Sequence, residues 1–240
     1  DCRFGKNWIK SMVQPFSNSQ TGFVSGPAPL THTNALINSM TEMESLSMDA
    51  FFAGVIKRGF PMSCTGRNMG FRKDAFNEVG GYQDISDQIS GDDDLLLQKI
   101  ASGSNWSVEF VTNPSAIVES PAPDSLEAFI LQRLRFASKG FKYYNLPSTV
   151  QIKIFLPYLF ISNAMVMVSL AQFTSRYEFV WVLPFFFKIF ADGLITLIFY
   201  NEISRKWSIP GFSIMSILHP FYVVILAVFG PFTKIKWKDG

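Results

Sequence analysis

The sequence predicts a two-part α/β protein: a soluble part in residues 1–150 and a helical membrane part in residues 151–240. Two observations carry this prediction. Residues 1–150 hold most of the acids, and their apolar positions recur at helix or strand spacing between Gly- and Pro-containing turns. From Ile152 onward, Phe, Ile, Leu and Val dominate.

Charge and cysteine content exclude several classes of protein. The net charge is only +2, and no Lys/Arg-rich stripe alternates with aromatic residues, so we expect no nucleic-acid partner. Cys2 and Cys64 lie far apart and outside any metal-binding spacing, which predicts reduced thiols in a cytosolic compartment. The sequence has no starting Met and no signal peptide, so we expect a fragment whose beginning is missing.

Periodicity and turn residues predict the elements of the first half. They are a helix over 8–16, a strand over 21–27, a long amphipathic helix over 33–58, a strand over 65–72 and a short helix over 73–79. The long helix contains no Pro and is followed by Gly59 and Pro61. The glycines of the 65–72 strand would let the backbone approach a ligand closely.

Gly91-Asp92-Asp93-Asp94 opens a predicted helix over 92–102. Three adjacent carboxylates repel one another, and a helix start needs only one cap. Because the helix dipole is positive at this end, acids there can also be purely structural. The alternative is an ionised, exposed carboxylate that takes a proton from a substrate hydroxyl.

Two short strands, over 105–111 and 116–118, precede a helix over 125–139 that we expect Asp124 to cap. One face of this helix carries Leu126, Phe129, Ile130, Leu134 and Ala137, and another carries Gln132, Arg135, Phe136 and Lys139. A Gln, an Arg and an aromatic ring together are able to bind a sugar and a phosphate. Spacing alone favours an ordinary solvated face.

Three apolar runs follow, over 154–173, 179–200 and 211–233. The first has 20 residues without a charge, enough to cross a hydrocarbon core of about 30 Å. Lys188 and Asp192 in the second run lie four residues apart, on one helix face. They line a translocation path or form an ion pair that fixes packing, and the ion pair is favoured.

The positive-inside rule conflicts with three full crossings. If the soluble part is cytosolic, Arg205 and Lys206 lie inside, but the lysines at 234, 236 and 238 would lie outside. We therefore expect one run to lie in the interface or to re-enter. Pro157 and Asn163 make the first run the candidate.

Four motifs occur in order along the chain. They are Gly66-Arg67-Asn68-Met69-Gly70-Phe71-Arg72, then Glu78-Val79-Gly80-Gly81-Tyr82, then Gly91-Asp92-Asp93-Asp94-Leu95, and finally Gln132-Arg133-Leu134-Arg135-Phe136. This order resembles the membrane-bound, inverting family 2 glycosyltransferases, which include cellulose, chitin and hyaluronan synthases. Gly91 stands where that family has Glu, and Phe136 where it has Trp.

The resemblance implies a GT-A fold, a Rossmann-like α/β nucleotide-diphospho-sugar transferase, of which residues 1–150 would be the C-terminal part. Residues 151–240 would hold about three transmembrane helices of a multi-pass protein of the cell membrane, with the catalytic part cytosolic. The implied reaction is a single inverting displacement at the anomeric carbon of a nucleotide-sugar. The acceptor would be lipid-linked or a polysaccharide, and the missing first half would leave the fragment alone inactive.

The resemblance also implies roles for named residues. Asp92 would be the general base, with Asp93 as the fallback, while Asp93 and Asp94 cap the helix. Gly66, Asn68, Gln132, Arg135 and Phe136 would bind the donor and acceptor. Asp1 would be the last Asp of an Asp-x-Asp motif and a ligand of Mg²⁺ or Mn²⁺.

Three alternatives stay open at this point. The chain could be a catalytically inactive glycosyltransferase-like scaffold at the membrane. It could be a processive polysaccharide synthase and exporter, although Phe136 in place of Trp argues for transfer of one or a few sugars. It could also be a transporter that uses Lys188 and Asp192, for which three spans are few.

Overall fold

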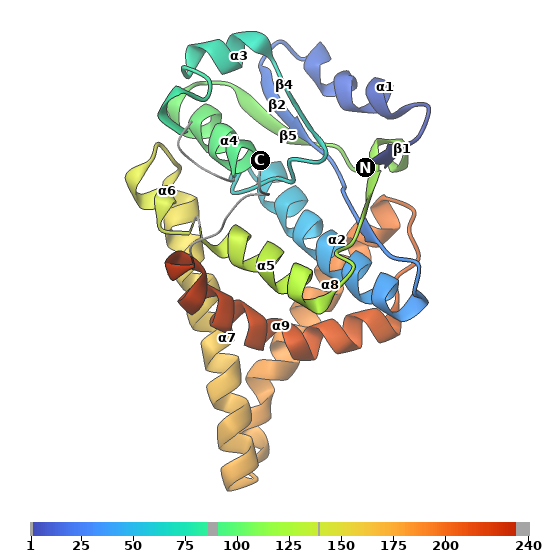
Figure 1. Ribbon diagram of the computed structural model, residues 1–240, viewed down its shortest axis with the longest axis vertical. Helices are drawn as coiled ribbons and strands as arrows, with labels where there is room; N and C mark the ends of the chain where they lie inside the picture. Colours follow the sequence, from blue (N-terminus) through green and yellow to red (C-terminus); the bar gives the residue numbers. More distant parts are fainter. Residues whose placement is uncertain (1, 86–90, 139, 234–240) are drawn as a thin grey trace.

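The computed structural model describes residues 2–85, 91–138 and 140–233. A rounded part holds all the strands, and a helical hairpin projects from it (Figure 1). The hairpin consists of α7 (Val150–Arg176) and α8 (Leu183–Glu202), joined by the short helix η4 (Phe179–Val182). The last long helix, α9 (Ile209–Phe229), lies across the base of the rounded part (Figure 1).

The described part of the chain contains six short strands in two three-stranded sheets. They are β1 (Arg3–Phe4), β2 (Thr21–Ser25), β3 (Leu30–Thr31), β4 (Met69–Phe71), β5 (Ser107–Phe110) and β6 (Val118–Pro121). Strand β2 is central in one sheet, antiparallel to β4 and parallel to β5. Strand β6 is central in the other, antiparallel to β1 and parallel to β3. The described residues thus hold small mixed sheets, and a Rossmann-like GT-A sheet is not shown by them.

The rounded part also holds helices, and all except the short α6, which the sequence does not predict, lie close to their predicted positions. They are α1 (Trp8–Val13), α2 (Ala35–Lys57), α3 (Lys73–Glu78), α4 (Asp92–Gly103), α5 (Leu126–Ala137) and α6 (Lys142–Asn145). One predicted cap is wrong: Ser125, not Asp124, caps α5, because its hydroxyl accepts a hydrogen bond from the Ala128 N–H at 3.1 Å. The strand predicted over 116–118 begins later, because Pro114–Ala116 forms a 3₁₀ turn.

Two apolar clusters fix the helices around the first sheet. Phe23 of β2 packs with the buried Leu96, Leu97 and Ile100 of α4. On α2, the buried side chains Met43, Leu46 and Ala53 pack with Phe199 and Tyr200 of α8. The end of the hairpin therefore belongs to the core of the rounded part, and burial of this area anchors the two together.

Helix α5 presents a different face to the core than the sequence predicts. Leu126 and Ile130 are 73% and 42% exposed, whereas Arg133 is buried. Arg133 is buried because its guanidinium pairs with the carboxylate of Glu44 on α2. Leu126 and Ile130 of the apolar face are then exposed, whereas Phe129, Leu134 and Ala137 stay half-buried.

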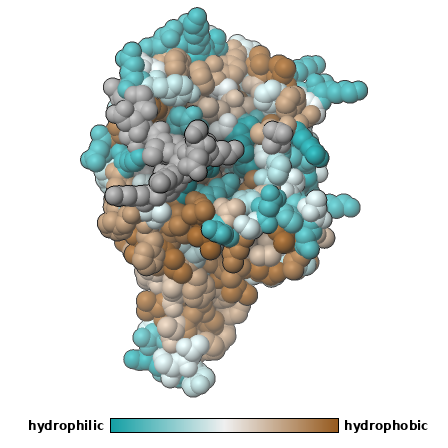
Figure 2. Space-filling view, in the orientation of Figure 1, coloured by the Kyte–Doolittle hydropathy of each residue, from teal (hydrophilic) through white to brown (hydrophobic). Residues whose placement is uncertain are grey.

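Helices α7, α8 with η4, and α9 with its short extension are long and apolar enough to cross a membrane. Helix α7 runs unbroken through Pro157. Figure 2 shows a mostly apolar surface on the hairpin and at the base of the rounded part, with a polar tip. Lys188 and Asp192 form an ion pair within α8, as the favoured interpretation predicts.

Candidate functional site

The loop of residues 63–68 is the centre of the candidate site. It carries the first part of the Gly-x-Asn motif and contacts α2 and the start of α4, while Asp93 beside it lies near α5. Residues from three of the four predicted motifs are therefore close together.

Asp94 fastens the loop to the protein. Its Oδ1 accepts hydrogen bonds from the Ser63 hydroxyl at 2.5 Å and the Cys64 N–H at 3.0 Å. Its Oδ2 accepts from the Tyr143 hydroxyl at 3.1 Å. Burial, and then the Asp94 charge, raise the pKa of Tyr143 well above its usual value. The prediction that Asp94 caps α4 is wrong, because its carboxylate accepts hydrogen bonds from residues far from the helix start.

Asp93 holds the next turn of the loop. Its Oδ2 accepts a hydrogen bond from the Gly66 N–H at 2.8 Å. A Cβ at position 66 would lie 2.5 Å from the same oxygen, so only Gly permits this approach. Its Oδ1 accepts from the Asp94 N–H at 2.8 Å, and α4 has no other side-chain cap. Asp93 thus holds the loop through a hydrogen bond to its backbone, and its fallback role as a base stays a prediction.

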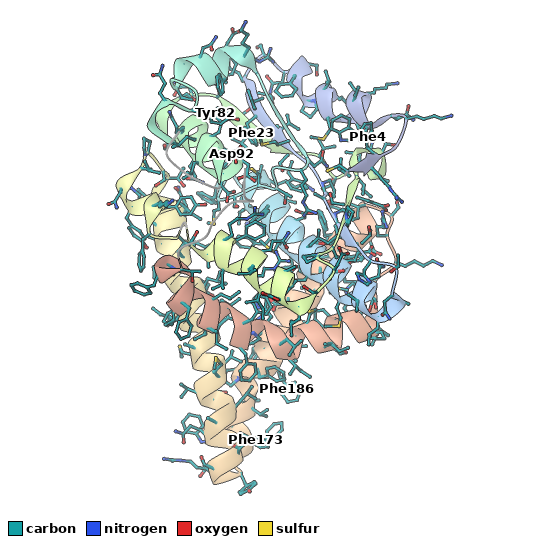
Figure 3. All side chains as sticks on the ribbon, in the orientation of Figure 1. Phe4, Phe23, Tyr82, Asp92, Phe173 and Phe186 are labelled. Atoms are coloured by element: carbon teal, nitrogen blue, oxygen red, sulfur yellow. The ribbon has the colours of Figure 1, made fainter. Side chains whose placement is uncertain are left out.

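Asp92 is the exposed member of the cluster and the first residue of α4. It follows Gly91, whose φ of 98° is in the left-handed region, where glycine is favoured. Among the described residues, no side chain or N–H donates a hydrogen bond to its carboxylate. Its charge lies close enough to Tyr82 to raise the pKa of that phenol, after the larger effect of burial. Figure 3 shows both residues at the same end of the rounded part.

A shallow hollow of about 600 Å³ lies beside Tyr82. It is lined by Phe76, Asn77, Gly80, Gly81, Tyr82 and Gln83. These residues include the turn of the second motif, so the hollow adjoins the exposed carboxylate of Asp92 through Tyr82.

Asn68 is fully buried, with no exposed surface. Its Nδ2 donates to the carbonyls of Pro27 at 2.8 Å and Ala116 at 2.7 Å. Its Oδ1 accepts from the Trp8 indole N–H at 3.0 Å. The amide therefore holds together the turns after β2 and before β6. Its predicted role as a substrate ligand stays a prediction, and these internal bonds favour a positioning role.

The predicted sugar and phosphate residues of α5 are partly brought to the site. Arg135 lies near Asp93; partial burial lowers the pKa of its guanidinium, and the Asp93 carboxylate opposes that shift. The Phe136 ring lies 5.4 Å from the guanidinium carbon of Arg133 and 5.5 Å from that of Arg135. Gln132 Oε1 is buried and accepts no hydrogen bond from the described residues.

Sequence reasoning missed a buried polar cluster behind the loop. On α2, Asp49 Oδ2 accepts from the Ala28 N–H at 2.7 Å, and Oδ1 accepts from the Thr65 hydroxyl at 3.1 Å. Burial raises the pKa of Asp49 to about 6, against the opposing charge of Arg67. One turn earlier, Glu44 pairs with Arg133. The available signal was two acids, Glu44 and Asp49, among the buried residues of this amphipathic helix.

Arg67 supplies a positive charge to this cluster. Burial lowers the pKa of its guanidinium, while the charges of Asp49 and Glu44 oppose the shift. Its Nη1 is buried and has no hydrogen-bond partner among the described residues. A cation with a spare buried donor therefore lies in the same loop as Gly66, where an oxyanion would find a partner.

The described residues do not form a metal site by themselves. In residues 2–85, 91–138 and 140–233, no group of three or more His, Cys, Asp or Glu side chains could hold a metal ion. Asp1, the predicted ligand of Mg²⁺ or Mn²⁺, lies outside the described residues. The metal stays an expectation from the resemblance.

The motifs, in the order and geometry just described, agree with the comparison to protein families. The family model for glycosyl transferase family 21 matches residues 1–240. The chain belongs to this family. No curated protein matches the chain. Membership of glycosyl transferase family 21 confirms the expectation of a glycosyltransferase, but it does not show the narrower likeness to the family 2 polymer synthases.

Proposed function

We propose that this family 21 chain is the C-terminal part of a membrane glycosyltransferase with Asp92 as general base. It would transfer a sugar, with inversion, from a nucleotide-sugar to a lipid-linked or polysaccharide acceptor. One observation carries the assignment of the base: the three acids have different surroundings. Asp93 and Asp94 hold the 63–68 loop, whereas Asp92 is exposed beside Tyr82.

The proposed reaction needs an ionised carboxylate with an accessible lone pair. Asp92 lies in the first turn of α4, at the positive end of the helix dipole. Its carboxylate would take the proton of the acceptor hydroxyl, and the resulting oxygen would attack the anomeric carbon. The bond from that carbon to the nucleotide diphosphate would break with its electron pair leaving on the diphosphate. Attack from the opposite face gives inversion.

Cationic groups around the loop support the leaving-group side of the proposal. Arg135 lies near Asp93, and Arg67 offers a buried donor with no partner among the described residues. Guanidinium groups stabilise the negative charge that develops on a diphosphate in the transition state. Gly66, Gln132 and Phe136 would contact the sugars, and metal dependence stays an expectation from the resemblance.

The fold supports the GT-A proposal only in part. The parallel pair β2–β5, with α4 packed against it, is the kind of unit that a Rossmann-like half-sheet contains. The exporter and transporter alternatives gain no support from α8, because Lys188 and Asp192 pair with each other. The cytosolic setting of the catalytic part is a further element of the proposal, taken from the resemblance.

The test is Asp92→Asn in the full-length protein, with sugar transfer from a labelled nucleotide-sugar as the readout. Loss of a general base lowers the rate about 10²–10⁴-fold. Asp74→Asn is the matched control, because Asp74 is also an exposed acid in the first turn of a helix, α3. Activity of Asp92→Asn within a few-fold of the Asp74→Asn protein would remove Asp92 from the base role.

A further inference from the structure

We propose that α9 does not cross the membrane but lies along its surface, with its apolar face against lipid. The chain would then cross twice in the described region, down through α7 and back through α8. This differs from the sequence-based expectation that the run over 154–173 is the one that does not cross. The inference does not depend on the proposed catalytic role.

Both ends of α9 touch the rounded part. At its start, a Cβ built on Gly211 would lie 2.3 Å from the Ser39 carbonyl oxygen of α2. Just after its end, a Cβ on Gly230 would lie 2.5 Å from the Ala137 Cβ of α5. The helix backbone therefore lies directly against α2 at one end and α5 at the other.

The middle of α9 is tied to the rounded part as well. The Tyr222 hydroxyl donates to Glu44 Oε1 of α2 at 3.2 Å. Residues 211 to 230 span about 28 Å of helix at 1.5 Å per residue, close to the thickness of a hydrocarbon core. A helix that crossed this core would carry one end to the far side. Because Gly211 and Gly230 both contact the rounded part, neither end of α9 lies on the far side of the core.

The α7–α8 hairpin has the opposite arrangement. Its turn, at Tyr177, projects away from the rounded part (Figure 1), and Tyr177 is 83% exposed. The turn packs on the hairpin itself: the Ser169 hydroxyl bonds the Trp181 carbonyl, and Arg176 lies over the Trp181 ring at 5.9 Å. Phe173 and Phe186 lie along the hairpin (Figure 3); Phe186 is 52% exposed and Phe173 is half-buried. Only α7 and α8 extend far enough from the rounded part to cross.

The outward face of α9 is apolar and continuous with the hairpin. Along this face lie six large side chains that are between 40% and 60% exposed: Ile217, Leu218, Phe221, Ile225, Val228 and Phe229. Helix α5 adds Leu126, Ile130 and Leu131. The apolar surface extends from the hairpin onto the base of the rounded part in Figure 2. A patch this wide is unusual on a surface that faces water, and a bilayer around the hairpin would cover it.

Two crossings also agree with the distribution of charge. Arg205 and Lys206 lie between α8 and α9, on the side of the rounded part, where Arg205 pairs with Glu42 and Glu119. The described chain ends at Thr233, next to the end of α9 and hence on the same side. The C-terminal lysines lie outside the described residues, and with two crossings they no longer oppose the positive-inside rule.

Cysteine labelling of the full-length protein in sealed, oriented vesicles tests the topology. In a background without native cysteines, Lys6→Cys marks the rounded part, Tyr177→Cys the hairpin turn and Thr233→Cys the end of α9. A membrane-impermeant maleimide should label positions 6 and 233 from the same side and position 177 from the other. Labelling of position 233 together with position 177 would overturn the proposal.

A depth measurement tests the orientation of α9 directly. Leu218 and Ile225 are exposed and seven residues apart, hence on one face of the helix. Nitroxide labels at these positions should report equal depths in the bilayer. A crossing helix would separate them by about 10 Å. Ile161 and Val168 on α7 are the matched control pair, and they should differ by about 10 Å. A similar difference on α9 would contradict the proposal.

Discussion

Glu44 of α2 and Arg133 of α5 form an ion pair whose side chains are only 3% and 7% exposed. The Tyr222 hydroxyl of α9 donates to the same carboxylate at 3.2 Å. Three helices from distant parts of the chain are therefore joined at one buried charge. Burial raises the pKa of Glu44, and the Arg133 charge opposes that shift. The pair matters because α5 carries the predicted sugar-binding residues and α9 lies at the proposed membrane surface.

Removal of one partner should cost much more than removal of both. Arg133→Met leaves the Glu44 carboxylate buried without its cation, and such changes cost about 3–5 kcal/mol of unfolding free energy. Denaturant unfolding in detergent measures the loss. The double change Glu44→Gln with Arg133→Met should recover a large share of it. A single variant as stable as wild type would contradict the buried pair.

Substitution of Gly66 should disturb the site more than the fold. In Gly66→Ala, the new Cβ would lie 2.5 Å from Asp93 Oδ2, so the hydrogen bond between the Gly66 N–H and that oxygen must break or lengthen. We expect transferase activity to fall at least tenfold, while the unfolding free energy falls by only about 1 kcal/mol, the value of one hydrogen bond. Activity and unfolding are measured on the same full-length preparation.

The control for that experiment is Gly54→Ala. Gly54 lies inside α2, and a Cβ there has nothing within 4 Å. Alanine in a helix interior is favoured over glycine by about 1 kcal/mol, so this variant should be slightly stabilised and fully active. Equal activity in the two variants would show that the contact between position 66 and Asp93 does not shape the site.

Asp49 should make stability fall as the pH rises. Burial raises its pKa from 3.8 to about 6, so the folded protein holds a proton that the unfolded chain releases. Between about pH 4 and 6 the unfolded chain binds fewer protons, and stability is lost as the pH rises through the folded pKa. The total is about 3 kcal/mol, from two pKa units at 1.36 kcal/mol each.

Asp49→Asn isolates this contribution. The amide keeps an oxygen for the Ala28 N–H and a donor for the Thr65 hydroxyl, but it does not titrate. Unfolding curves between pH 4.5 and 7 should be flatter for the variant than for wild type. Burial also raises the pKa of Glu44, so Glu44 likewise makes stability fall as the pH rises. This contribution to the slope should remain in the variant. An unchanged slope would show that Asp49 titrates at its ordinary value.

The sequence predicts elements that depend on neighbouring residues, but it does not predict contacts between residues far apart in the chain. The long α2 and the short α3 follow from periodicity, caps and breakers within a few residues, and these predictions are confirmed. The inward face of α5 depends instead on Glu44, 89 residues before Arg133, which no local pattern reveals. Likewise, the three apolar runs are evident from composition. Which of them leaves the rounded part depends on packing of α9 along α2.

The acidic cluster shows the same limit within four residues. From composition, the three aspartates are equivalent, and register alone favours Asp92. Their different roles come from partners elsewhere in the chain: Ser63 and Tyr143 for Asp94, and the Gly66 N–H for Asp93. Side-chain contacts across 27 to 49 residues decide which carboxylate is left exposed.

Asp94→Asn and Asp92→Asn should therefore separate stability from catalysis. In Asp94→Asn, the new NH₂ must face either the Ser63 and Cys64 donors or the Tyr143 hydroxyl. A charged acceptor of several buried hydrogen bonds is lost, at a cost of about 2–3 kcal/mol. Asp92 is exposed, so Asp92→Asn should change unfolding by less than about 0.5 kcal/mol. Both variants are compared by denaturant unfolding and by sugar transfer.

The two losses of activity should also differ in kind. Asp94→Asn loosens the loop that holds Gly66, so low temperature or a saturating nucleotide-sugar donor should restore part of its activity by favouring the folded loop. Neither condition supplies a base, so Asp92→Asn should stay inactive while it remains folded. If Asp94→Asn is instead as stable as wild type and is inactive under every condition, Asp94 acts on the reaction itself and not only through the stability of the loop.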